Sequence, residues 1–380
     1  MIVVADDITG AAEIAGICLR YGISVSFGID EIPSEADVRI IATDSRSLSE
    51  EEAYRIHKVL AEKINGDNGS ESVFKKCDSV IRGYVLTEAD VLARTLGKQS
   101  ILIQPTNPEM GRIIKNNTYY IDGVLLDSTG FSIDPDFPAF TSSVEELLVN
   151  RSDKWDTSNS IPYSISDCTS KEELEYIADS ANDNTLLCGS AAFFEQVLIR
   201  NIDVKINQAE TTNHAESKQS KFPGDYLFIS GSTHPSGDEF RKNMRQLGCP
   251  IVSIDEDLFT KEPDNSKISD FCIKLKEIYT LHHNRLIVYV DYGSQFPDSS
   301  PITIKNVISE VAKQLFAILN FHDAFIDGGS TAFDIFKTTE LQNFMPQSEL
   351  SPGVVRLKSL DRDNLHITIK PGSYKWPELF

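Results

Sequence analysis

The sequence predicts an α/β protein of two domains, each built on a largely parallel or mixed sheet flanked by helices. Short apolar runs alternate with longer amphipathic segments along most of the chain, which is the pattern of repeated strand–helix units. The chain has 380 residues, whereas a single hydrophobic core stops growing at about 250–300 residues. Apolar residues make up 41% of the chain, which is enough for two packed cores.

The N-terminal half begins with a predicted strand, loop and helix. Ile2–Ala5 is a short apolar run, and the periodic segment Ala11–Tyr21 predicts a helix after it. The same order returns in the strand Val38–Ala42 and the helix Ser49–Lys63, which Ser49 can cap. Two further runs predict strands: Ser72–Lys76 and Ser100–Gln104.

The regular alternation is interrupted twice. Tyr119–Leu126 alternates around Asp122-Gly123, which indicates a hairpin. Residues 207–224 are polar, lack periodicity and end in Pro-Gly, which is typical of a linker. We therefore expect domains at residues 1–206 and 225–380, joined by a polar linker at 207–224.

The C-terminal half returns to alternating strands and helices. Its predicted strands are Tyr226–Ile229, Leu286–Val290, Ala324–Ile326 and Leu365–Ile369, and its predicted helices are Phe240–Leu247 and Ile302–Leu319. In an open α/β sheet, ligands bind beyond the carboxyl ends of the strands. The loops that follow these strands are therefore the first candidates for a site.

The charge balance excludes several classes of partner. The chain carries 36 basic and 57 acidic residues, a net charge of −21. Such a surface repels nucleic acid and anionic membranes, so we expect neither as a partner. A small anionic ligand would also be repelled at long range. Any anion site must therefore be local, built from a few lysines, arginines and backbone N–H groups.

The cysteines and the N-terminus indicate a cytoplasmic protein. The six cysteines are scattered without a CxxC or Cys/His cluster, so we expect reduced thiols, and the sequence does not identify metal ligands. The opening residues, MIVVADDITG, lack a basic-then-apolar leader, and no apolar run is long enough to cross a membrane. A homo-oligomer is compatible with the sequence, which does not fix the oligomeric state.

Two adjacent aspartates, Asp6 and Asp7, lie between the first predicted strand and helix. Adjacent carboxylates repel each other and raise each other's pKa unless a cation or a set of substrate hydroxyls lies between them. A simpler interpretation is that Asp7 or Thr9 caps the helix. For the isolated motif we favour this simpler interpretation.

The densest mixed cluster of the N-terminal half is the stretch 75–79, KKCDS, with Arg82 after it. Lys76 and Arg82, with Lys75 as a further candidate, could neutralise a carboxylate, the arginine through two parallel hydrogen bonds. Asp78 could accept a hydroxyl proton, and Arg46 adds a cation at the end of another predicted strand. A surface loop with an ordinary salt bridge is the simpler interpretation of this cluster taken alone.

Three loops that contain glycine and hydroxyl residues follow predicted strands in the C-terminal half. They are Ser230-Gly231-Ser232, Asp327-Gly328-Gly329-Ser330-Thr331 and Lys370-Pro371-Gly372-Ser373-Tyr374. Glycine lets the backbone approach a phosphate, while hydroxyls and helix N-terminal N–H groups donate hydrogen bonds. No loop matches a Walker motif or GxGxxG, so each alone is equally a tight turn with a capping serine. Three in one domain favour anion binding.

Taken in order, these motifs resemble the four-carbon acid sugar kinase family, formerly a domain of unknown function. The resemblance covers nearly the whole chain and rests on the ordered set more than on any one motif. The motifs that carry it are Ala5–Ala11, Thr43–Arg46, Lys76–Gly83, Gly111–Pro135, Ser230–Ser232, Gly328–Ala332, Ser351–Val354 and Lys370–Tyr374. It implies an ATP-dependent kinase that phosphorylates the C4 hydroxyl of D-threonate, D-erythronate or 3-oxo-tetronate, with Mg²⁺ bridging the phosphates.

The resemblance also implies a layout: an N-terminal sugar-acid domain, a C-terminal nucleotide domain and an active-site cleft between them. Matched by position, the acid site comprises Asp6, Arg46, Lys76 and Arg82, with Asp7 or Asp78 as equal alternatives for the group that accepts the hydroxyl proton. The ATP contacts comprise Ser230, Gly231, Ser232, Gly328, Gly329, Ser330, Thr331 and Gly372.

Two other functions stay open at this point. One is a non-catalytic regulator that binds a nucleotide or metabolite on the same scaffold, although the intact charged loops in both halves count against it. The other is a transferase or hydrolase that acts on a sugar acid without a nucleotide. ATP consumption that depends on an added four-carbon acid would separate all three.

Overall fold

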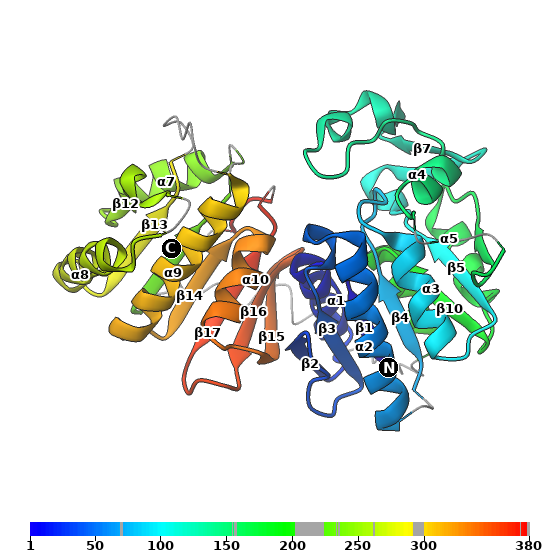
Figure 1. The fold of residues 1–380 in the computed structure, drawn as a ribbon, viewed down its shortest axis with the longest axis horizontal. Helices are drawn as coiled ribbons and strands as arrows, with labels where there is room; N and C mark the ends of the chain where they lie inside the picture. The colour runs from blue at the N-terminus through cyan, green and yellow to red at the C-terminus, as the bar shows by residue number, and fades with distance from the viewer. Residues whose placement is uncertain are drawn as a thin grey trace, which may run out of the picture. The chain divides into compact units, whose positions relative to one another are not determined.

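The computed structural model describes residues 1–68, 71–153, 155, 158–201, 224–232, 234, 236–260, 263–291, 300–372 and 374–377. The chain divides into two compact units, Met1–Lys205 and Ile206–Phe380, and each is described by itself. Of the predicted linker at 207–224, all but Gly224 lies outside the described residues. Both units have helices on the faces of a largely parallel or mixed sheet, so the predicted α/β class is confirmed (Figure 1).

The main sheet of the N-terminal unit is parallel throughout its described pairs. Its strands are β1 (Ile2–Ala5), β2 (Val25–Ile29), β3 (Val38–Ala42), β4 (Val73–Lys76), β5 (Ser100–Gln104), β9 (Tyr163–Ile165) and β10 (Thr185–Gly189). They lie in the order β2-β3-β1-β4-β10-β5-β9. Every residue of β1 to β4 is buried, as expected for parallel strands that helices cover on both faces.

The strand order places a topological switch point at β1. The chain passes from β1 to β2, returns to β3 beside β1, and then crosses to β4 on the other side of β1. The helices are α1 (Ile8–Arg20), α2 (Glu50–Asn68), α3 (Val85–Thr95), α4 (Val144–Asn150), α5 (Lys171–Asp179) and α6 (Ala191–Asn201), with 3-10 turns η1 (Ser45–Ser47), η2 (Pro108–Met110), η3 (Leu126–Ser128) and η4 (Gly130–Ile133). In open α/β sheets, ligands bind at a topological switch point such as the one at β1.

The predicted helix caps are present. Asp7 is the N-cap of α1, and its carboxylate accepts a hydrogen bond from the Gly10 amide at 3.0 Å. Before α2, Ser49 Oγ accepts from the Glu52 amide and the Glu52 carboxylate accepts from the Ser49 amide, which is a capping box. The two helices therefore begin within three residues of their predicted starts.

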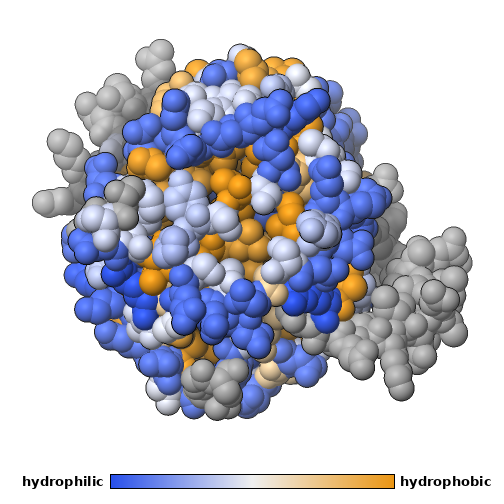
Figure 2. Space-filling model, turned by 90° about the vertical axis from the view of Figure 1, so that its right-hand side faces the viewer, coloured by the Kyte–Doolittle hydropathy of each residue, from blue (hydrophilic) through white to orange (hydrophobic). Residues whose placement is uncertain are grey.

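A small antiparallel sheet forms a lobe on the N-terminal unit. It comprises β6 (Arg112–Lys115), β7 (Thr118–Ile121) and β8 (Val124–Leu125), and the label β7 marks it in Figure 1. The hairpin predicted around Asp122-Gly123 is confirmed, with both residues at positive φ. Tyr119 is buried and joins the core of the unit, so the lobe is packed against it. The face shown in Figure 2 is largely hydrophilic, with apolar side chains gathered near its centre.

The C-terminal unit contains a mixed sheet. Its strands are β11 (Tyr226–Ser230), β12 (Ile251–Ser253), β13 (Arg285–Tyr289), β14 (Asp323–Asp327), β15 (Asn343–Ser351), β16 (Val354–Ser359) and β17 (His366–Lys370). They follow the order β12-β13-β11-β14-β17-β16-β15, parallel as far as β17 and antiparallel from there. Its helices are α7 (Ser236–Gln246), α8 (Asn265–Leu281), α9 (Pro301–Ile318) and α10 (Gly329–Thr338), with the 3-10 turn η5 (Glu256–Leu258).

Aromatic side chains fill part of the C-terminal core. Phe228 stacks on Phe240 with ring centroids 4.7 Å apart, and Trp376 meets Phe228 edge-on at 5.1 Å. Such pairs add to the burial of their apolar surface. Among the described helices of both units, none has the length and apolar character needed to cross a membrane.

Candidate active site

Three neighbouring strand ends bring together the site residues predicted in the N-terminal half. Strands β3, β1 and β4 are adjacent and parallel, so the loops that follow them start at one edge of the sheet. These loops carry Asp6 and Asp7 after β1, Arg46 after β3, and Asp78 and Arg82 after β4. The predicted set is therefore assembled by the switch point of the sheet.

Arg46 is the centre of this cluster, because its guanidinium faces three carboxylates. Nη2 lies 2.7 Å from Asp7 Oδ2, while Nη1 lies 3.4 Å from Asp78 Oδ1 and 3.7 Å from Asp6 Oδ2. Burial alone would lower the pKa of Arg46, but the three aspartates outweigh it and raise the pKa. The side chain keeps 20% of its surface exposed, so a ligand can reach it.

Asp7 has two roles, since it caps α1 and pairs with Arg46. One carboxylate oxygen accepts from the Gly10 amide, and the other lies against the Thr9 hydroxyl and Arg46. Burial alone would raise the pKa of Asp7, but Arg46, Lys76 and the Thr9 hydrogen bond hold it below its ordinary value. The simpler interpretation of the Asp-Asp motif, a helix cap, therefore coexists with a place in the charged cluster.

Asp78 is saturated with hydrogen-bond donors. Its Oδ2 accepts from the Val80 and Arg82 amides, both at 3.1 Å, and from Arg82 Nε at 3.0 Å, while Oδ1 accepts from Arg82 Nη2 at 2.9 Å. Burial opposes ionisation, yet Arg82, Arg46 and Lys76 lower the pKa of Asp78 far below its ordinary value. The side chain is an anion at every pH near neutrality.

Asp6 differs from the other two aspartates. It is 2% exposed, and its Oδ1 is buried without a hydrogen-bond partner in the described part of the chain. Burial raises its pKa to about 6, although Arg46 and Lys75 act in the opposite direction. A buried carboxylate oxygen without a donor is costly. Asp6 is therefore the aspartate of the cluster whose ionised form is least stabilised.

The two lysines of β4 point to opposite faces of the sheet, as neighbours on a strand do. Lys76 lies beneath the first turn of α1, where its Nζ donates to the Cys77 carbonyl at 2.9 Å. A Cβ placed at Gly10 would lie 3.0 Å from that Nζ, so the glycine admits the lysine. Lys75 is fully buried and pairs with Glu88 at 2.8 Å, so it is not available to a ligand.

Arg82 links the cluster to the small lobe. Its Nη1 lies 3.2 Å from Asp134 Oδ2, and its guanidinium lies 5.6 Å from the centroid of the Phe131 ring. With 29% of its side chain exposed, Arg82 is the most accessible cation of the cluster. Asp134 and Glu88 were missed as members of this charged network. Both stand in segments without a strand-to-loop pattern, so the sequence offers no local signal for them.

The three predicted loops of the C-terminal unit also lie side by side. They follow β11, β14 and β17, which are adjacent and parallel. The Gly231 amide donates to the Asp327 carbonyl and the Gly328 amide to the Lys370 carbonyl, both at 3.1 Å. Ser232 Oγ donates to the Gly372 carbonyl at 3.3 Å. These bonds join the loops into one continuous surface at the strand ends.

The glycines of these loops are required by close approach. A Cβ at Gly231 would lie 2.2 Å from Thr331 Oγ1, and one at Gly372 would lie 2.8 Å from Ser232 Oγ. Gly328, at φ 111°, is the N-cap of α10 and supplies no side-chain acceptor to the first turn of that helix. Gly329, Ser330 and Thr331 form this first turn, while Ser373 lies outside the described residues.

The chemistry of these loops fits a phosphate group. The buried Ser230 Oγ at the end of β11 has no hydrogen-bond partner among the described residues, and the N-terminus of α10 attracts negative charge. Lys370 has a different role from the one its charge suggests. Its Nζ lies 2.7 Å from Asp327 Oδ1 and donates to the Pro371 and Tyr374 carbonyls. It therefore holds the loop in place from within the core.

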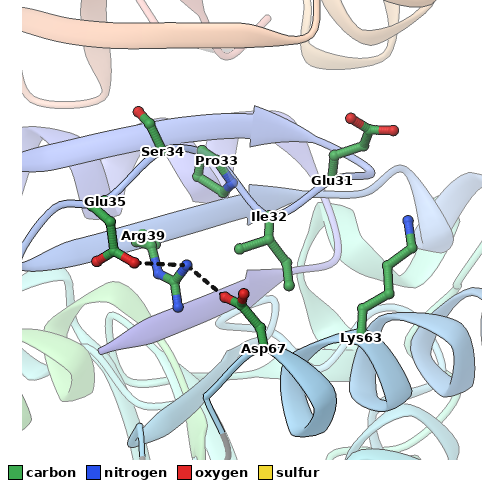
Figure 3. Close-up of a pocket in the computed structure, with 8 residues that line it drawn as sticks. All are labelled: Glu31, Ile32, Pro33, Ser34, Glu35, Arg39, Lys63 and Asp67. Atoms are coloured by element: carbon green, nitrogen blue, oxygen red, sulfur yellow. Dashed lines mark hydrogen bonds and ion pairs between the residues drawn. The ribbon is translucent and has the colours of Figure 1, made fainter.

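One described cavity lies in the N-terminal unit, near the amino end of β3. It measures about 560 Å³ and is lined by Glu31, Ile32, Pro33, Ser34, Glu35, Arg39, Lys63 and Asp67 (Figure 3). Arg39 lies near the amino end of β3 and pairs there with Asp67 at 3.0 Å. No predicted site residue lines this cavity. Among the described residues, no group of three or more His, Cys, Asp or Glu side chains could hold a metal ion.

Comparisons with known proteins found relatives that are similar to this chain in sequence and solved structures that are similar to it in fold. A family model described as a sugar-binding N-terminal domain matches residues 1–157. A 3-oxo-tetronate kinase from Haemophilus influenzae is 21% identical over 416 residues, covering 100% of this chain and 97% of that protein. One from Brucella melitensis is 29% identical over 157 residues, covering 40% of this chain and 36% of that protein. Other relatives are named D-threonate kinase and D-erythronate kinase.

These matches support the resemblance of the chain to the four-carbon acid sugar kinase family. A crystal structure of a Haemophilus influenzae protein from a family once named as a domain of unknown function has the same fold, with a TM-score of 0.68 and 18% identity over 100% of this chain and 98% of that one. The resemblance drawn from the motifs is therefore confirmed at the level of the family. The sugar-binding model covers the loops of Asp6, Arg46 and Arg82, and also Asp134 in the lobe.

Proposed function

We propose that this protein is an ATP-dependent kinase of the four-carbon acid sugar kinase family. It would transfer the γ-phosphoryl group of ATP to the C4 hydroxyl of threonate, erythronate or 3-oxo-tetronate. The observation that carries the proposal is the cluster of partly exposed arginines and aspartates at the ends of β3, β1 and β4, in the part that matches a sugar-binding model. The names of the relatives support it.

The substrate carboxylate would bind to Arg82 and Arg46. These are the exposed cations of the cluster, and a guanidinium offers two parallel N–H groups to a carboxylate. Lys76 is 3% exposed and its Nζ already donates to a carbonyl, so it would contribute through its charge. The net charge of −21 makes such local cations necessary for an anionic substrate.

Asp7 or Asp78 would orient the C4 hydroxyl and accept its proton. The contacts favour Asp7, because Asp78 already accepts five hydrogen bonds. In the reaction, the hydroxyl oxygen forms a bond to the γ-phosphorus, the bond from that phosphorus to the β–γ bridging oxygen breaks, and ADP leaves. Since the transition state is loose, positioning and charge neutralisation matter more than the strength of the base.

The nucleotide would bind to the C-terminal loops. Ser230, Ser232 and the first turn of α10 would donate to its phosphates, and the glycines would let the backbone come close. Mg²⁺, when bound, would neutralise the charge of the phosphates, largely through water ligands. The described residues present no protein cage for a metal, which fits an ion held mainly by the nucleotide and water.

A coupled assay of ADP formation across threonate, erythronate and their oxo derivatives tests the proposal. We expect ADP formation to depend on both ATP and one of these acids. Nucleotide binding without turnover of any acid would favour the regulator instead. Conversion of an acid without nucleotide would favour another transferase or a hydrolase.

A further inference from the structure

A buried isoleucine in the acid-site loop has a left-handed backbone. Ile81 is 1% exposed and has φ 63°, a conformation that β-branched residues rarely adopt. Such a residue keeps this conformation only where its surroundings hold it there, and these positions gather at functional sites. Gly83 also has positive φ, at 88°, so two left-handed residues flank Arg82.

This conformation directs Arg82 back onto Asp78. The Ile81 amide donates to the Asp78 carbonyl at 3.1 Å, which closes a turn. The backbone and side chain of Arg82 then both reach the Asp78 carboxylate. If Ile81 relaxed to negative φ, the chain after it would change direction and Arg82 would leave this position.

Arg151 holds the carbonyl of the strained residue. It follows α4 directly, is 9% exposed, and donates from Nη1 to the Ile81 carbonyl. Nη2 donates to the carbonyls of Phe137 and Pro138, both at 2.9 Å. No ion pair joins Arg151 to a carboxylate within the described part of the chain. Burial lowers its pKa to about 10, so the side chain stays a cation near neutral pH.

The same arginine also anchors the second partner of Arg82. Asp134 Oδ1 accepts from the amides of Asp136 at 3.1 Å and Phe137 at 2.8 Å. Arg151 binds the carbonyl at the end of this turn, so one guanidinium connects the Asp78–Gly83 loop to the turn that carries Asp134. Arg151 therefore holds, through hydrogen bonds to backbone carbonyls, the two segments that carry Asp78 and Asp134. These are the carboxylates that orient Arg82.

We propose that Arg151 is a positioning residue of the acid site, which fixes the left-handed turn at Ile81 and so aims Arg82 at its ligand. Arg151 need not touch the substrate for this role. The assignment to substrate binding rests on the proposed function, because it takes Arg82 as the carboxylate anchor. The structural part of the proposal, control of the loop, is independent of that function.

The test combines two readouts on Arg151→Met. We expect the amides of Val80 and Arg82, which both donate to Asp78, to exchange with solvent about tenfold faster in the variant. We also expect the KM for the acid to rise about tenfold, with a smaller change in kcat. Arg200→Met is the matched control, since Arg200 also donates to two backbone carbonyls, those of Ala178 and Ala181. It should leave both readouts unchanged.

A double-mutant cycle tests whether Arg151 acts through Ile81. Glycine adopts positive φ without steric cost, so Arg151→Met should accelerate exchange less in an Ile81→Gly background than in the native one. An equal acceleration in both backgrounds, or none in the native background, would overturn the proposal. If Arg151→Met fails to fold, Arg151→Lys keeps the cation and should give a smaller acceleration in the same direction, and no acceleration there would equally overturn it.

The two failures can be told apart. If the unaltered chain forms no ADP with any of the acids, the proposed function fails while the exchange measurement still tests the role of Arg151. If ADP forms but exchange and KM do not respond to Arg151→Met, the kinase stands and the positioning role fails.

Discussion

Asp6 is the aspartate of the charged cluster whose ionised form is disfavoured by burial. Its neighbours Asp7 and Asp78 have lowered pKa values because arginine or lysine partners outweigh their burial. Asp6 Oδ1 has no hydrogen-bond donor among the residues that the structure describes, and burial raises the pKa of Asp6 to about 6. At neutral pH the fold therefore holds an ionised carboxylate where a neutral side chain would be more stable.

The substitution Asp6→Asn should stabilise the chain at neutral pH. Between pH of about 4 and about 6 the folded state binds a proton that the unfolded state has already lost, so the native chain loses stability as pH rises through this window. A shift from 3.8 to about 6 corresponds to roughly 3 kcal/mol. Urea unfolding at pH 7.5 should show the variant to be more stable by up to this amount. The difference should vanish below pH 4, and a pH-independent difference would contradict the assignment.

The substitution Arg82→Lys should weaken binding of the acid. Lysine keeps the charge but loses the planar pair of N–H groups, and with it the double contact to Asp78. We expect the KM for the acid to rise about tenfold or more, with little change in the KM for ATP. Arg94→Lys is the control, because Arg94 also pairs four residues along the chain, with Asp90 at 2.7 Å. If Arg82→Lys and Arg94→Lys had a similar KM for the acid, Arg82 would not be part of the acid site.

Among the elements, those that form regular strand–loop–helix units were predictable. The apolar runs of β1, β3 and β4 and the polar residues after them are adjacent in sequence, so the meeting of Asp7 with Asp78 followed from parallel strand geometry. Asp134, after η4, and Arg151, after α4, reach the cluster from segments whose position no periodicity encodes. The strand β2, VSFGI, was not predicted because its glycine and serine weaken the strand pattern.

The three C-terminal loops were predictable for the same reason, whereas the role of Lys370 was not. A lysine beside Pro-Gly resembles a phosphate ligand in sequence. In the structure it is buried against Asp327 because the last residue of β17 points into the core. The sequence alone cannot tell which face of the sheet receives the final side chain of a strand when the loop after it folds back.

The substitution Gly231→Ala should impair nucleotide binding. The new Cβ would lie 2.2 Å from Thr331 Oγ1 and 3.2 Å from Thr331 Cβ, so the first turn of α10 would have to move. We expect a fluorescent ATP analogue to bind about tenfold more weakly, with no change in the affinity for the acid. Gly224→Ala, where the added Cβ meets nothing within 4 Å, is the matched control. Unchanged nucleotide binding by Gly231→Ala would exclude this loop from the nucleotide site.

At the scale of the whole molecule, the two ligands are assigned to separate units of the chain. The acid cluster lies within Met1–Lys205 and the glycine loops lie within Ile206–Phe380. Each set stands at carboxyl strand ends of its own sheet. A reaction between the two ligands therefore requires a contribution from both units, which no single loop can replace.

Hydrogen exchange on the full chain should separate the two sites. An acid alone should protect the loops around Asp6, Arg46 and Arg82, and a non-hydrolysable ATP analogue alone should protect residues 230–232 and 328–332. We expect each ligand to leave the other set unchanged at saturation. If both ligands protected the same loops, the assignment of one ligand to each unit would be contradicted.

The crowding of carboxylates around Arg46 has a consequence for how an anion enters the site. Nitrogen atoms that already face Asp7 and Asp78 can meet an incoming carboxylate only by exchanging partners. The free energy gained on binding is then the difference between the ion pair that forms and the ion pair that is lost. This exchange disfavours simple inorganic anions, which offer only their charge. A hydroxylated acid can supply hydroxyl donors to the displaced aspartates, so the cluster favours ligands that carry both chemistries.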